Sequence, residues 1–113
     1  MAVDNRGTVV RYTGTGVNDN DVLFTTGDVL QCEEFYLMST AGAMDVFVSL
    51  DGTNFSTAPL SLVDLGATTT DPVLVTAANR VYAFFGRYTK VRVLQNGATG
   101  VANAVLNCAR SLP

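Results

Sequence analysis

The sequence contains no histidine and no tryptophan. Histidine is the usual general base at neutral pH, and it activates the serine and cysteine nucleophiles of many enzymes. Together with cysteine it also supplies most zinc ligands. The chain has two cysteines, without a CxxC pair, so it lacks a zinc ligand set. We therefore expect no enzyme activity, no metal site and no cofactor.

Charged residues are also scarce. They make up 15% of the chain, whereas hydrophobic residues make up 48%, and soluble domains usually contain about 25% charged residues. So few charges favour a protein whose surface is partly covered by neighbouring molecules. A monomer coated with threonine, asparagine and serine is the alternative.

The net charge is −3. Nucleic-acid binding requires an excess of lysine and arginine to neutralise phosphates, so we expect no nucleic-acid partner. Residues 1–56 contain two basic and eight acidic residues (net −6), and residues 57–113 contain five basic and two acidic residues (net +3). This asymmetry either steers docking onto an acidic partner or a second copy, or cancels when the fold interleaves the two halves.

No apolar stretch approaches the roughly 20 residues of a membrane span, and the first residues lack the basic-then-apolar pattern of a secretory signal. We expect no membrane partner. The protein is expected to stay in the cytosol or to leave it inside a larger particle. The distant cysteines, Cys32 and Cys108, leave a cross-sheet disulfide geometrically open. A reducing site of synthesis favours two buried free thiols instead.

The length of 113 residues suits one domain. We expect an N-terminal arm over residues 1–20 and a β-sandwich domain over residues 21–113. Strand signals alternate with turns every 8–12 residues from Asp21 onward, which is typical of a sandwich or barrel. The expected strands are residues 8–13, 22–26, 32–38, 44–50, 60–65, 73–76, 80–85, 88–95 and 101–109.

The clearest strand is residues 44–50. Met44, Val46, Val48 and Leu50 alternate with polar or outward residues, which is the period of a half-buried strand, and Asp51-Gly52 then signals a hairpin turn. Eight or nine strands in one domain predict an all-β, two-sheet antiparallel sandwich, jelly-roll-like. An immunoglobulin-type sandwich is the alternative, and the missing tryptophan counts against it.

Two groups of residues are candidates for partner binding. Arg87, Tyr88, Lys90 and Arg92 place an aromatic ring among basic groups, which suits phosphate, sugar or an acidic protein surface. The simpler explanation is a solvated strand face whose charges pair with acidic residues on a neighbouring strand. The second group lies in the arm. Its members are Val9, Val10 and Tyr12. These residues would pair with the sheet edge of a neighbouring subunit. The alternative is that they form a plain first strand with a frayed end.

Residues 46–55 (VFVSLDGTNF) and 86–93 (GRYTKVRV) resemble a jelly-roll pattern of small phage structural proteins. The whole chain, which is short and rich in threonine, asparagine and glycine, is similar to the capsid decoration (cement or staple) proteins of short-tailed phages. This resemblance implies a non-enzymatic virion protein on the capsid surface, made in the host cytoplasm. It further implies binding across major capsid protein subunits as a dimer or trimer.

The same sequence pattern, in residues 46–55 and 86–93, also resembles discoidin-like carbohydrate-binding modules, although this chain is shorter than those modules and lacks tryptophan. The alternative function is therefore a carbohydrate-binding sandwich of a phage fibre or baseplate. Sugar recognition needs an outward aromatic platform close to polar side chains, and Phe47 is the best candidate.

Overall fold

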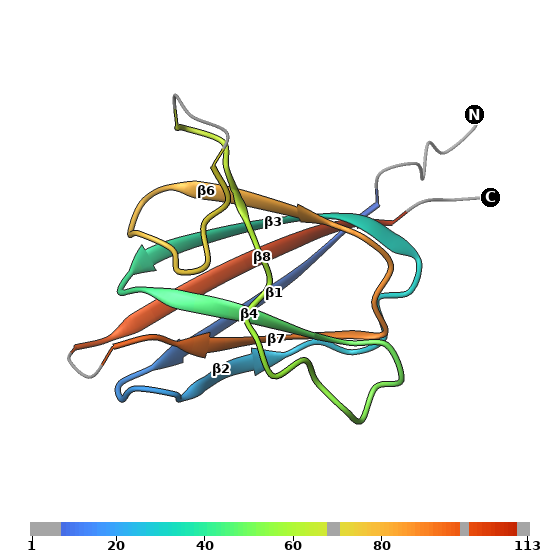
Figure 1. Ribbon diagram of the computed structural model, residues 1–113, viewed down its shortest axis with the longest axis horizontal. Coiled ribbons are helices and arrows are strands. Elements are labelled where there is room, and N and C mark those ends of the chain that lie inside the picture. Colours follow the sequence, from blue (N-terminus) through green and yellow to red (C-terminus); the bar gives the residue numbers. More distant parts are fainter. Residues whose placement is uncertain (1–7, 68–70, 98–99, 111–113) are drawn as a thin grey trace.

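A computed structural model describes residues 8–67, 71–97 and 100–110 of the chain. These residues form eight strands and no helix (Figure 1), so they include no helix that could cross a membrane. The strands are β1 (Thr8–Gly16), β2 (Val22–Thr25), β3 (Cys32–Ala41), β4 (Met44–Ser49), β5 (Val63–Asp64), β6 (Val81–Phe85), β7 (Lys90–Gln95) and β8 (Ala102–Arg110).

The strands pair in two antiparallel sheets. One has five strands in the order β1-β8-β3-β6-β5, and the other has three in the order β2-β7-β4. From β1 to β4, and again from β6 to β8, consecutive strands fall in alternate sheets, as in a jelly roll. An immunoglobulin sandwich would instead place its first two strands side by side in one sheet. The predicted all-β sandwich is confirmed.

The core lies between the two sheets. Inward side chains of β8 alternate with outward ones, as the sequence predicts, and Leu106 and Cys108 are fully buried. Phe35 of β3 stacks on Phe84 of β6, with ring centroids 4.8 Å apart. Because burial of a leucine or phenylalanine contributes about 1.5–3 kcal/mol, this layer is the main source of stability.

The segment between β4 and β6 is less regular than predicted. The expected strand at residues 60–65 shrinks to β5, and the expected strand at 73–76 shrinks to one isolated bridge between Leu62 and Val73. Pro59 and Pro72 lack the N–H that a regular ladder needs. The segment still runs beside β4, because Leu60 N–H donates to the Val46 carbonyl at 2.7 Å. Figure 1 shows it crossing in yellow-green from the three-stranded sheet to β6.

The predicted alternation in β4 holds for Met44, Val46 and Val48, which face the core. It fails at Leu50, which was expected on the same side but is 75% exposed. The strand ends at Ser49, and the turn that follows turns Leu50 outward. The turn residues therefore decide the orientation of Leu50, and the strand period does not.

Residues 8–16 of the expected arm form β1, which pairs with β8 along its whole length from Thr8–Arg110 to Gly16–Ala102. Residues 1–7 lie outside the described residues. At Gly14 the backbone passes so close to β2 that an added Cβ would stand 1.9 Å from the Leu23 carbonyl oxygen. Glycine is required at this contact between the two sheets.

Cys32 on β3 and Cys108 on β8 are both buried, and they form no disulfide. The expectation that both thiols are buried without a cross-sheet disulfide is confirmed. The Cys108 thiol lies 3.7 Å from the carbonyl oxygen of Val10, so it packs against β1 as a small apolar side chain does.

Two leucine-to-alanine changes test where the stability lies. Leu106→Ala removes a side chain with 0% exposure and should lower the free energy of unfolding by about 2–5 kcal/mol. Leu50→Ala, in the exposed turn, should change it by less than about 0.5 kcal/mol. Urea denaturation monitored by circular dichroism measures both, and equal losses would contradict this placement of the core.

Candidate binding surfaces

The candidate residues predicted from the sequence lie in three places. Lys90, Arg92 and Phe47 point outward from the three-stranded sheet, since they alternate with buried residues of β7 and β4. The three β1 candidates lie on the other sheet. Arg87 and Tyr88 lie in the loop between β6 and β7.

Arg92 is the centre of the first group. It lies opposite Phe47 on β4 and opposite Thr25 on β2, and its Nε donates to the Thr25 hydroxyl at 3.3 Å. Its guanidinium carbon stands 3.9 Å from the ring centroid of Phe55. This is close enough for a cation–π interaction. We call Phe47, Phe55, Lys90 and Arg92 the basic–aromatic face.

Phe55 reaches this face because a tight turn folds the chain back along β4, where Phe55 bridges to Ser49. In the turn, the Asp51 carboxylate accepts hydrogen bonds from the backbone N–H groups of Asn54 (2.7 Å) and Thr53 (2.8 Å) and from the Asn54 side-chain amide (2.7 Å). These donors, those of Asn54 first, hold the pKa of Asp51 well below its usual range. Gly52 supplies the positive φ of 84° that the turn requires.

The basic charges of this face have no acidic residue directly opposite them on the adjacent strands. Lys90 lies opposite Ser49, and Arg92 lies opposite Phe47 and Thr25. Asp45 of β4 lies on the same face, diagonal to Arg92, but within residues 8–67, 71–97 and 100–110 neither cation makes an ion pair. Direct ion pairing therefore does not account for the two cations, which lie beside two aromatic rings.

Arg87 and Tyr88 do not belong to this face. Arg87 forms an ion pair with Glu33 and donates to the Leu30 carbonyl at 3.1 Å. Tyr88, expected beside Lys90, packs instead against the core, where its ring centroid is 5.9 Å from that of Phe35. Burial raises the pKa of Tyr88. Because Tyr88 precedes the start of β7 at Lys90, strand alternation does not extend to it.

Of the three β1 candidates, one is exposed to solvent and two pack against the core. Val9 is 54% exposed. Val10 and Tyr12 pack against the core, and the Tyr12 ring stacks on Phe24 with centroids 6.2 Å apart. Val9 is therefore the member of this group that faces outward.

Acidic side chains gather where β4 begins and β7 ends. Partial burial raises the pKa of Asp45, and repulsion from Asp19 acts in the same direction, whereas the Asn96 amide at 3.3 Å opposes both. Asp21 accepts from the backbone of its own turn, which lowers its pKa. The described part of the chain contains no group of three or more acidic or cysteine side chains placed to hold a metal ion.

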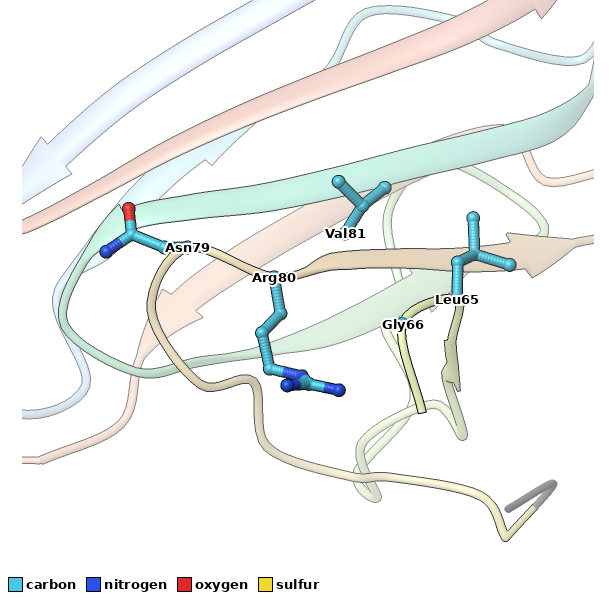
Figure 2. Close-up of a pocket in the computed structure, with 5 residues that line it drawn as sticks. All are labelled: Leu65, Gly66, Asn79, Arg80 and Val81. Atoms are coloured by element: carbon cyan, nitrogen blue, oxygen red, sulfur yellow. The ribbon is translucent and has the colours of Figure 1, made fainter. Parts of the chain in front are cut away.

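A shallow pocket of about 350 Å³ lies at the edge formed by β5 and β6. Figure 2 shows Arg80 extending from the start of β6 toward the segment with Leu65 and Gly66. Its guanidinium is already engaged, because Nε lies 2.6 Å from the Asp64 carboxylate. This hydrogen bond lowers the pKa of Asp64. The pocket lining contains no nucleophile paired with a base.

No protein-family model matches this sequence, and no curated protein matches it. Solved structures share its fold. The SPBc2 prophage-derived protein YomS aligns over 88% of this chain and 95% of its own, with a TM-score of 0.65 and 11% identity. At this identity the similarity establishes a common fold.

Two further structures align less closely. The Yersinia pseudotuberculosis-derived mitogen aligns over 95% of this chain and 89% of its own, with a TM-score of 0.45 and 14% identity. The dTDP-4-dehydrorhamnose 3,5-epimerase of Bacillus anthracis aligns over 95% of this chain and 55% of its own, with a TM-score of 0.47 and 9% identity.

The Asp51 turn predicts a pH dependence of stability. A carboxyl group whose pKa is lowered by folding stabilises the protein above its unfolded pKa of about 3.9, and this contribution is lost as the pH falls toward the folded value. Asp51→Asn should therefore be less stable than wild type at pH 7, and the difference should shrink below about pH 4.

Urea midpoints measured from pH 7 to pH 2 give this comparison. Asp51→Glu, which keeps the charge but displaces the carboxylate by one methylene, shows whether charge alone suffices. A constant difference between wild type and Asp51→Asn at every pH would contradict the role of the ionised carboxylate.

Proposed function

We propose that this chain is a non-enzymatic structural protein of a phage virion, which decorates the capsid surface by binding across major capsid protein subunits. The observation that carries the proposal is the fold shared with the prophage-derived YomS over nearly the whole of both chains. The sequence resemblance to capsid decoration proteins supports it independently. In this proposal the protein is made in the host cytoplasm and incorporated into the particle.

The basic–aromatic face suits this role. Lys90 and Arg92 carry positive charge without forming an ion pair with another described residue, although the chain as a whole is negative. An acidic patch on a capsid subunit would be attracted to this charge and would contact the rings of Phe47 and Phe55. Many such weak contacts, repeated over a shell, add by multivalency.

A non-enzymatic role agrees with the chemistry of the surfaces. The basic–aromatic face contains cations and aromatic rings, and the pocket at β5 and β6 has an arginine that is already paired with Asp64. Neither arrangement provides a nucleophile with a general base, and the sequence offers no histidine to complete one.

Carbohydrate binding is the second candidate, because Phe47 points outward beside Arg92 on the same face. Sugars stack on an aromatic ring while nearby polar groups bind their hydroxyls. A glycan array probed with the purified chain tests this candidate. Binding to sugars without binding to capsids would replace the first proposal with the second.

Co-sedimentation with empty capsids of the same phage tests decoration directly. The purified chain should pellet with capsids and stay in the supernatant without them. If it stays in the supernatant at saturating capsid concentration, the proposal is wrong.

Charge reversal on the basic–aromatic face gives the sharper prediction. Lys90→Glu combined with Arg92→Glu should reduce capsid occupancy at least about tenfold at low salt, and wild-type binding should weaken as salt rises. Gel densitometry of the pellets measures occupancy.

The control is a second double variant with the same change of net charge. Lys90→Gln with Arg92→Gln removes the two cations of the face. Ser61→Asp with Ala78→Asp lowers the net charge equally, at exposed positions that do not belong to the face. The first pair should weaken binding and the second should not. Equal effects would mean that net charge, and not this face, governs binding.

A further inference from the structure

The outer face of the five-stranded sheet is the second conspicuous surface. Its side chains form rows across β1, β8, β3 and β6, because the register of these strands places alternate residues side by side. We call its hydrophobic members the apolar face, and they are Val9, Tyr36, Met38, Val81, Phe85 and Val105.

Three of these side chains, Val9, Val81 and Phe85, are exposed, and the other three, Tyr36, Met38 and Val105, are half-buried. Phe85 is 54% exposed and Val81 is 37% exposed, and Val63 of β5 extends the surface with 44% exposure. Isolated exposed hydrophobic residues are ordinary, but a contiguous apolar surface on a flat sheet marks an interaction site. Polar side chains share this face, among them Thr13, Thr15, Asn103 and Asn107, so the apolar side chains lie between polar ones.

The face carries few charged side chains, and these are one cation and one anion. Among the described outward side chains of the four strands, Arg11 and Glu34 are charged, and Glu33, near the start of β3, forms an ion pair with Arg87. Arg11 lies opposite Asn107 and donates from Nε to its Oδ1 at 2.9 Å, and Glu34 lies opposite Ala109 and accepts from the Tyr36 hydroxyl at 3.5 Å. The two charges therefore flank β8 diagonally, and each keeps further hydrogen-bonding capacity. One cation and one anion placed in this way can satisfy each other twice in a symmetric pair.

We propose that two copies of the chain associate back to back through the apolar face. The two-fold axis lies in the plane of the interface and crosses β8 between Asn107 and Ala109. This rotation sets Arg11 of each copy over Glu34 of the other. The proposal goes beyond capsid binding, since it concerns the chain alone.

The strand register supports this axis. Strands lie about 4.8 Å apart, and outward residues recur every second position along each strand. On that grid, the rotation that pairs Arg11 with Glu34 also brings Met38 over Val81 of the second copy and Tyr36 close to its own counterpart. One operation therefore matches charge to charge and most apolar side chains to apolar side chains, with Phe85 falling over Thr13 of the second copy, and such matching is what a self-complementary interface requires.

Sedimentation equilibrium of the purified chain, from micromolar to submillimolar concentration, tests the proposal. The expected mass is twice that of the 12.0 kDa monomer. Val81→Asp buries an unpaired charge in the interface and should raise the dimer dissociation constant at least about tenfold. Phe85→Ser is the second variant, in case Val81→Asp fails to fold, and the urea midpoint reports folding of each.

Val22→Asp is the matched control, because Val22 is 51% exposed on the outer face of the three-stranded sheet. It should leave the dissociation constant unchanged. Arg11→Glu and Glu34→Arg should each weaken the dimer at least about tenfold, and the double swap should restore most of the affinity.

Three outcomes would overturn the proposal. They are a monomer at every concentration, a Val22→Asp variant as disruptive as Val81→Asp, and a double swap that fails to restore association. Since no capsid is present, the result is independent of the co-sedimentation experiment.

Discussion

The pairing of β8 with two neighbours is the constraint on which the rest of the structure depends. β8 lies between β1 and β3, and its inward side chains form the centre of the buried layer. The first and last described strands of the chain are thereby joined across nearly a hundred residues. Long-range pairing of this kind places residues 8–16 in the sheet, aligns the outward rows of the five strands, and fixes which side chains the sheet presents to solvent.

The fold class was predictable because the signals that determine it are local. Alternation through Met44, Val46 and Val48 identifies a half-buried strand, and the same pattern identifies β8. Local signals fail where the chain leaves the strand geometry. Leu50 obeys the alternation in the sequence, but it follows Ser49 into a turn and becomes exposed. Residues 73–76 have the composition of a strand, yet in the structure they form one isolated β-bridge, between Val73 and Leu62.

The candidate surface was predictable in part for the same reason. Lys90 and Arg92 share a face because they are two residues apart in one strand. Phe55 was not recognised as a member, because its position under Arg92 depends on how the Asp51 turn returns the chain along β4. Tyr88 was misplaced, because the strand begins after it. Apart from Val9, the members of the apolar face were not recognised from the sequence, since the face forms only when four strands distant in the sequence are in register.

The two cysteine thiols have a consequence for where this fold can exist. Both are buried and form no disulfide, and the described residues contain no metal-binding group. Packing, hydrogen bonds and ion pairs therefore hold the described sandwich together without a covalent cross-link. Because the fold has no disulfide to form or to break, a change from reducing to oxidising surroundings alters none of its cross-links.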